Sequence, residues 1–319
     1  MIRTAAHWLS PGGARARLSV LIFHRVFAQP DPLAPSEPDL PRFEQLLRWV
    51  SRWFQVLPLD EAVARLAAGT LPPRAAAITF DDGYADNAEV ALPALQRAGL
   101  PATFFIATGF LDGGRMFNDT VIETVRACRG PWLDLEQAGL GRWAMDSIEA
   151  RRQAIDRLLP AIKYLEPPRR EAVVALVQQA AGAPLPTDLM MRSEQVIALR
   201  RAGMQIGAHT RTHPILARLG DAVAREEIEG SKQDLQSLLG EPVTLFAYPN
   251  GKPGTDYGPE HAVMVREAGF AAAVSTAAGA ASAGSDLFQV PRFLPWDRAR
   301  ARFGLRLLNN LRSGSGARA

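Results

Sequence analysis

Cysteine is nearly absent from this chain, which has one residue of that type, Cys128, among 319. A lone thiol excludes an internal disulfide framework and suits a reducing compartment. Long hydrophobic runs are missing as well. No apolar stretch approaches the roughly 18 residues of a membrane helix, and the start MIRTAAHWLSPGGARAR is broken by Pro11, Gly12 and Gly13. The sequence therefore predicts neither a signal peptide nor a membrane anchor, and we expect a cytoplasmic protein.

The chain also lacks a large excess of charge of one sign, because 36 Lys and Arg are nearly balanced by 33 Asp and Glu, which leaves a formal net charge of +3. The arginines are not interleaved with stacking aromatics, so we expect no nucleic acid partner. In the basic C-terminal tail, residues 298–319, Phe303, Leu307 and Leu311 share helical spacing. This tail is either a helix in peripheral contact with an anionic bilayer, which would make the protein membrane-associated, or a basic solvated helix.

Short apolar runs alternate with amphipathic stretches along most of the chain, in which 47% of the residues are hydrophobic and 22% are charged. This composition is typical of a globular protein with a large core. The alternation predicts an α/β protein with a mainly parallel sheet. The candidate strands cover residues 18–23, 75–80, 102–107, 204–208, 243–247 and 271–275.

Helical patterns fall between these strands. Residues 42–54 carry apolar side chains at helical spacing, and a later pattern opens with Ser193 as the expected N-cap. Between the third and fourth strands lies a long segment without a clear strand. We interpret residues 111–190 as a helical insertion within a single domain that covers residues 1–319.

Two adjacent carboxylates, Asp81 and Asp82, follow the buried run of the second candidate strand in the stretch AITFDDGYADN. Adjacent carboxylates repel each other and are costly to bury without a partner. One interpretation is a simple turn, since Asp and Gly are common turn residues. The other interpretation is a functional site in which a positive group offsets both charges.

Histidine is scarce, with five residues, yet His209 and His213 stand four apart at the end of the fourth candidate strand, in IGAHTRTHPIL. Such a pair can be structural. In a β/α barrel, however, the carboxyl ends of the strands meet, which would bring both imidazoles to Asp82. Two imidazoles and one carboxylate suit a catalytic divalent metal such as zinc. Thr210 follows His209, so the H-E-x-x-H arrangement of zinc proteases is absent.

The second carboxylate of the pair can then take a separate role. If Asp82 holds the metal, Asp81 can accept a proton from the attacking water. The metal also offsets the repulsion between the two carboxylates. An acyl carbon is the natural target of the resulting nucleophile.

Together, TFDDG and H-T-x-x-H resemble the motifs of the polysaccharide deacetylases, carbohydrate esterase family four, and the resemblance extends from LIFHRV through FAYPNG to VPRFLPW. The resemblance implies a distorted (β/α)7-type barrel. It also implies that Asp81 is the base and that Asp82, His209 and His213 bind the metal. The implied reaction is metal-dependent hydrolysis of an N-acetyl or O-acetyl group on a sugar, with release of acetate.

The chain departs from the pattern of this family in its third motif. Where the motif usually reads Arg-x-Pro-Tyr, the stretch AYPNG has Ala247 and Asn250. Tyr248 and Asn250 are candidates for the substrate and oxyanion side of the site, the latter through its backbone N–H. Arg292 in VPRF is the candidate for orienting the base in place of the missing arginine, the alternative being a surface arginine at a strand end.

The usual late histidine of the family, the general acid, is absent too. His7 precedes the first candidate strand, and His261 lies in a predicted polar helix. His24 ends the first candidate strand, where it resembles the corresponding residue of exopolysaccharide-type deacetylases. We therefore expect His24 to be the general acid, the alternative being a core histidine hydrogen-bonded at a strand end.

The sequence thus predicts a metal-dependent sugar deacetylase that acts on an acetylated amino sugar in an oligosaccharide, a glycolipid or a nucleotide-linked precursor. The alternative enzyme is another carbon–nitrogen hydrolase of the same fold, such as a deformylase or a ring-opening amidase. A sugar-binding pseudoenzyme is an alternative of another class. The intact Asp81, Asp82, His209 and His213 disfavour it.

Overall fold

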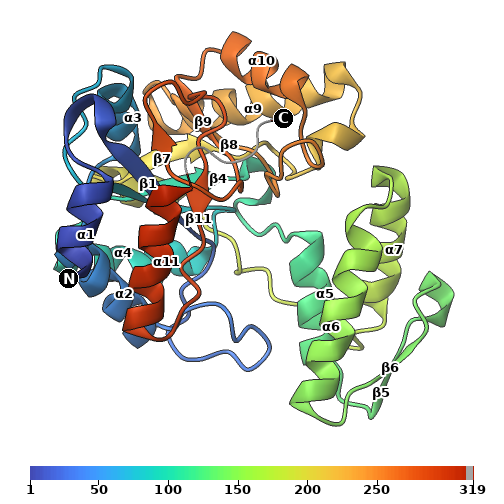
Figure 1. The fold of residues 1–319 in the computed structure, drawn as a ribbon. Coiled ribbons are helices and arrows are strands. Elements are labelled where there is room, and N and C mark those ends of the chain that lie inside the picture. Colours follow the sequence, from blue (N-terminus) through green and yellow to red (C-terminus); the bar gives the residue numbers. More distant parts are fainter. Residues whose placement is uncertain (314–318) are drawn as a thin grey trace.

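The computed structural model describes residues 1–313 and residue 319. At its centre lies a curled sheet, whose strands are β1 (Arg17–Phe23), β2 (Gln55–Val56), β3 (Ala75–Phe80), β4 (Thr103–Ile106), β7 (Gln205–Ala208), β8 (Leu245–Ala247), β9 (Ala272–Val274), β10 (Ala281–Ser282) and β11 (Arg292–Phe293) (Figure 1). The main path of neighbours runs β10, β1, β3, β4, β7, β8 and β9, while β2 pairs with β3 and β11 with β1. All pairs are parallel except β1 with β10. The expected distorted (β/α) barrel is confirmed.

The six candidate strands are confirmed to within two residues at each end. Each of them is covered on both faces. In β1, for example, Leu18 and Val20 belong to one buried apolar cluster, whereas Leu21 and Phe23 belong to another. Successive side chains of a strand point to opposite faces, so a strand buried on both faces appears in the sequence as a nearly continuous apolar run.

Helices surround the sheet (Figure 1) and are α1 (Ile2–Leu9), α2 (Leu40–Trp53), α3 (Leu59–Ala67), α4 (Leu92–Ala98), α8 (Ser193–Arg201), α9 (Asp221–Leu239), α10 (Pro259–Glu267) and α11 (Arg300–Arg312). The helix predicted over 42–54 is confirmed as α2. The expectation that Ser193 is an N-cap is wrong, since Arg192 holds that position. The Ser193 hydroxyl instead donates to Asp112 Oδ2 at 2.6 Å, in the loop that faces the start of α8.

A group of elements between β4 and β7 lies to one side of the barrel (Figure 1) and consists of α5 (Phe117–Ala127), β5 (Trp132–Asp134), β6 (Arg142–Ala144), α6 (Ile148–Lys163) and α7 (Pro167–Gln179). These elements share an apolar core that includes Val121, Leu133 and Val177. The expectation of no strand here is wrong, because β5 and β6 form an antiparallel hairpin. Strands of three residues are too short to show a period in the sequence. The boundaries 111–190 and the single domain stay predictions.

The C-terminal helix α11 packs onto the barrel. Phe303, Leu307 and Leu311 are fully buried in the main apolar core, where the Phe303 ring lies 5.7 Å from that of Trp49. The prediction that these three residues form a free face for a bilayer is therefore wrong, because the apolar stripe of the helix covers the core instead. Among the described residues, no helix has both the length and the apolarity needed to cross a membrane. Residues 314–318 of the predicted tail lie outside the described residues.

Candidate active site

The carboxyl ends of β1, β3, β7 and β8 meet on one side of the sheet, as expected for neighbouring parallel strands. An open cavity of about 470 Å³ lies at this place. The structure brings six of the residues singled out from the sequence to its wall, namely His24, Asp81, Asp82, His209, His213 and Asn250.

Asp82, His209 and His213 form a compact group, whose possible ligand atoms all lie within 4.8 Å of one another. Asp82 Oδ1 is 3.4 Å from His209 Nε2 and 3.3 Å from His213 Nε2. Asp82 and His213 have left-handed backbone conformations, with φ of 77° and 53°. Such conformations are strained in residues that carry a side chain and often mark functional sites. Here they accompany three side chains that point to one spot.

The histidines of this group can offer lone pairs to a cation. His209 Nδ1 lies 2.7 Å from the carbonyl oxygen of Ala247, which can only accept, so Nδ1 carries the hydrogen and Nε2 faces Asp82. Burial lowers the pKa of His209, but the carboxylates of Asp81 and Asp82 raise it above its ordinary value. A cation between Nε2 and Asp82 would replace the proton held there.

His213 and Asp82 complete this donor set. Burial lowers the pKa of His213 to about 4, so its imidazole is neutral at pH 7. Burial opposes the ionisation of Asp82, but its hydrogen bond with His209 and, at the acidic pH where His213 is protonated, the charge of that imidazole hold the pKa of Asp82 below the ordinary value. One carboxylate oxygen and two imidazole nitrogens fit Zn²⁺ or another divalent transition metal.

Asp81 lies beside this group, with Oδ2 3.9 Å from His209 Nε2, and is held by Arg292 of β11. Arg292 Nη1 and Nη2 each donate to one Asp81 oxygen at 2.7 Å. The Arg292 side chain is 0% exposed, which excludes the alternative of a surface arginine. Burial raises the pKa of Asp81, but the charges of Arg292 and His209 outweigh it and keep the pKa below the ordinary value. The pair therefore keeps Asp81 ionised and in one orientation.

Arg292 reaches Asp81 because the end of the chain crosses the sheet from β9 to β1. The backbone N–H of Val290 donates to the carbonyl of Ala273 in β9 at 2.9 Å. Two residues later, Arg292 pairs with Val20 of β1. Ala247, which stands where the family arginine would be, contributes its carbonyl oxygen to His209.

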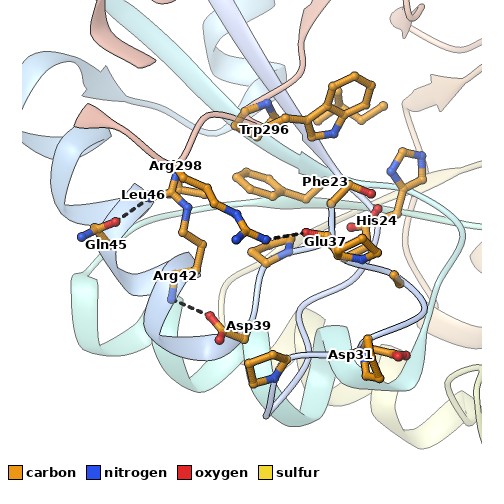
Figure 2. A pocket seen from close by; sticks show the side chains of 18 of the residues that line it. Phe23, His24, Asp31, Glu37, Asp39, Arg42, Gln45, Leu46, Trp296 and Arg298 are labelled. Carbon is orange, nitrogen blue, oxygen red and sulfur yellow. Dashed lines mark hydrogen bonds between the residues drawn. The ribbon is translucent and has the colours of Figure 1, made fainter. Parts of the chain in front are cut away.

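His24 lies between two cavities. It lines the cavity that holds Asp82, His209 and His213. It also lines a second cavity of about 500 Å³, whose wall includes Glu37, Trp296 and Arg298 (Figure 2). The His24 side chain is half-buried, and it faces both cavities. This placement disfavours the alternative of a core histidine.

The loop that carries His24 is held by two buried residues that sequence reasoning missed, although both lie in the DDGYADN stretch. Asn87 Nδ2 donates to the carbonyl oxygen of His24 at 2.9 Å. Asp86 accepts from the backbone N–H of Val26 at 3.0 Å and from Arg25 Nε at 2.7 Å. The stretch that supplies the paired carboxylates therefore also positions His24.

The structure does not bring Tyr248 to the cavity. Its buried ring stacks on that of Tyr257 at a centroid distance of 3.8 Å, and its hydroxyl donates to the carbonyl of Phe288 at 2.9 Å. The expected place of Tyr248 on the substrate side is therefore corrected to a packing role. Asn250 does line the cavity, at a turn where its φ is 58°.

Part of the cavity wall comes from the elements beside the barrel. Phe117 and Asn118 of α5, Lys163 of α6 and the following Tyr164 line it. Sequence reasoning missed these residues, and no motif marks them. Their place at the site depends on how α5 and α6 rest against the strand ends, which no local pattern encodes.

The proposed ligand set predicts the metal content of the protein. The purified protein should hold about one divalent ion per chain. His213→Ala should lose both the ion and activity, because only two of the three protein ligands would remain. His7→Ala changes an exposed histidine on α1 and should retain both. Elemental analysis of the two variants checks this prediction. Full occupancy in His213→Ala would show that the ligand set is wrong.

Comparison with known sequences places the chain in a family. Residues 68–129 and 152–273, more than half of the chain, match the family model described as polysaccharide deacetylase. The homologue YxkH of Bacillus subtilis (strain 168) is 32% identical over 93 residues, which are 28% of this chain and 32% of that protein. The chain thus matches about a third of the length of this curated relative.

Three solved structures share the fold. The deacetylase PplD of Streptococcus pyogenes, solved in complex with acetate, has a TM-score of 0.61 at 18% identity and covers 93% of this chain and 98% of its own. IcaB from Ammonifex degensii has a TM-score of 0.58 at 19% identity, and the match covers 95% of this chain and 99% of IcaB. The BpsB deacetylase domain from Bordetella bronchiseptica has a TM-score of 0.55 at 16% identity, and the match covers 87% of this chain and 95% of that domain. At such identities the likeness concerns the fold alone, and it agrees with the family model: the chain belongs to the polysaccharide deacetylase family.

Proposed function

We propose that this protein is a metal-dependent sugar deacetylase, which hydrolyses the N-acetyl group of an amino sugar in a glycan or glycan precursor and releases acetate. One observation carries the proposal. Asp81, held by Arg292, lies next to a group of one carboxylate and two imidazoles in an open cavity. The family of the chain supports this activity, and the related PplD structure is a complex with acetate. A cytoplasmic location accords with the lone cysteine.

The metal site of the proposal consists of Asp82, His209 and His213. When bound there, a Zn²⁺ ion polarises an acyl oxygen and lowers the pKa of water. The three side chains occupy one part of the cavity wall and leave the rest to water and substrate.

Asp81 is the general base of the proposal. Both of its oxygens accept from Arg292, but each has a second lone pair and can accept a proton from the attacking water. The water oxygen then bonds to the acetyl carbon, and the acetyl oxygen becomes an oxyanion. The backbone N–H of Asn250, on the cavity wall, is our candidate donor to this oxyanion.

His24 is the general acid of the proposal. When the intermediate collapses, the carbon–nitrogen bond breaks and its electron pair goes to the nitrogen, which takes a proton from His24. An amide anion is too basic to leave without that proton. The products are acetic acid, which loses its proton to solvent and becomes acetate, and the free amine; solvent then removes the proton from Asp81 and restores that of His24.

The second cavity gives room for sugar units beside the one that is deacetylated. It adjoins the reaction site at His24 and is walled by Trp296, which is 59% exposed, and by polar groups such as Asp39 and Arg298 (Figure 2). An aromatic face with hydrogen-bonding groups around it suits a saccharide. We therefore propose an oligosaccharide or glycolipid substrate.

A substrate panel tests the proposed function. We expect the purified protein to release acetate from at least one N-acetylated glycan, glycolipid or nucleotide sugar, to lose this activity with a chelator and to regain it with Zn²⁺. N-formyl analogues in the same panel separate a deacetylase from a deformylase. Binding of the sugars without any release of acid would instead favour a pseudoenzyme.

The role of His24 predicts a difference between amide and ester substrates. His24→Ala should remain folded and metal-loaded but lose roughly two to four orders of magnitude in kcat on an amide. An ester should suffer less, because an alkoxide leaves more easily without a proton. The check is kcat for acetate release from an N-acetyl sugar and from an acetate ester, with His7→Ala as control. Equal losses on both substrates would place the acid elsewhere.

A further inference from the structure

The N-terminal and C-terminal helices, α1 and α11, lie side by side at one edge of the molecule (Figure 1). Large apolar side chains are exposed on them. Trp8 of α1 is 80% exposed and Leu305 of α11 is 63% exposed. Two adjoining surface hollows are lined by both helices and share Ala5, Leu305 and Leu308. We call this surface the α1–α11 face.

The charged groups of the α1–α11 face are all of one sign. Neither α1 nor α11 contains an acidic residue. The arginines that line the hollows are Arg3, Arg52, Arg300 and Arg312. All four are exposed, and none forms an ion pair within the described part of the chain. Two other arginines of α11, by contrast, pair with Asp297.

Folding cannot turn the exposed apolar side chains inward. The opposite side of α11 is already buried through Phe303, Leu307 and Leu311. The two helices also pack closely at Gly304 of α11. A Cβ added at this glycine would lie only 2.9 Å from Ile2 Cδ1 of α1. The helices are thus fixed to the barrel, and the α1–α11 face stays outward.

We propose that the α1–α11 face docks onto an anionic lipid bilayer. Trp8 and Leu305 would enter the interface between headgroups and acyl chains, while Arg3, Arg52 and Arg312 would contact the lipid phosphates. Interfacial helices bind through buried apolar area together with attraction of basic side chains to anionic lipids. A second copy of the chain fits less well, because a symmetric contact would bring arginines of both copies together. This inference is independent of the proposed function.

Vesicle binding by the full chain tests the proposal. We expect co-sedimentation with vesicles of phosphatidylcholine that contain about 30% phosphatidylglycerol, little binding to pure phosphatidylcholine, and weaker binding at high salt. The double variants Trp8→Ser/Leu305→Ser and Arg3→Glu/Arg312→Glu should each reduce the partition coefficient roughly tenfold or more. Trp132→Ser is the matched control, since Trp132 is 50% exposed on β5 beside Arg142. It should bind as the parent does.

Three outcomes would overturn the proposal. The first is equal binding to neutral and anionic vesicles, and the second is unchanged binding by both double variants when circular dichroism shows that they are folded. The third is concentration-dependent self-association of the parent that Trp8→Ser/Leu305→Ser abolishes, which would assign the α1–α11 face to a second copy. None of these measurements involves the active site, so a failure here leaves the proposed deacetylase activity untouched.

Discussion

Asp81→Asn should retain the metal and lose turnover by two to four orders of magnitude or more, the usual range for a general base. The amide has nearly the shape of the carboxylate but cannot accept the proton of the attacking water. The ligand group is left intact, because its oxygen comes from Asp82 and its nitrogens from the two histidines. The measurements are kcat for acetate release and metal content by elemental analysis.

The control for this prediction is Asp60→Asn, which changes an exposed aspartate in the first turn of α3, away from the cavity. It should leave both turnover and metal content unchanged. Loss of the ion in Asp81→Asn would contradict the division between a ligand, Asp82, and a base, Asp81. Normal turnover in that variant would exclude Asp81 as the base.

Arg292→Met should lower both the free energy of unfolding and turnover, because it leaves the buried Asp81 carboxylate without its partner. Breaking a buried ion pair from one side typically costs about 3–5 kcal/mol in the free energy of unfolding. Turnover should fall as well, since Asp81 loses the group that orients it, while metal content should remain. Urea denaturation, initial rates and elemental analysis measure the three quantities.

The pH profile separates a positioning role of Arg292 from a purely structural one. The guanidinium favours the ionised form of Asp81 and keeps its pKa below the ordinary value. Without that charge the base holds its proton to a higher pH, so the acidic limb of the pH–rate profile should move upward in Arg292→Met. Arg292→Lys keeps the charge but not the two-point contact, and should restore part of the effect. An unmoved acidic limb would show that Arg292 does not act through Asp81.

A double variant gives a further test of the buried pair. Asp81→Asn removes the charge that Arg292→Met leaves unpaired, so the combination should be more stable than Arg292→Met alone. Additive losses of stability in the two single variants would show that the contact contributes no coupling energy. The matched surface pair for this cycle is Arg65 with Glu61 on α3, where any coupling should be about 1 kcal/mol or less.

Much of the fold follows from local patterns. The six apolar runs became strands because a strand covered on both faces has to be apolar at most positions. The same placement explains why Asp82, His209 and His213 meet: each follows the carboxyl end of a parallel strand or lies in the turn after it, and these ends share one side of the sheet. Motif spacing alone was therefore enough to predict this group.

Contacts between distant segments lie beyond such patterns. The sequence offered Arg292 as a partner of Asp81 but left a surface position open, and the contact forms because the last strand crosses from β9 to β1. The sequence made Tyr248 a candidate site residue, but in the structure its hydroxyl donates to the carbonyl oxygen of Phe288. The apolar stripe of α11 fits a membrane or a core equally well, and the packing of Phe303 against Trp49 decided for the core.

The sequence by itself thus determined the strands, the parallel order that gathers their ends, and the carboxylates and histidines at those ends. Each of these depends on residues close together in the chain, through side-chain alternation and the direction of the strands. Only the tertiary structure decided which side chain holds Asp81, which residues position the loop of His24, and which apolar side chains stay exposed. Those outcomes depend on burial, and burial is set by all the elements that pack around a residue rather than by its neighbours in the chain.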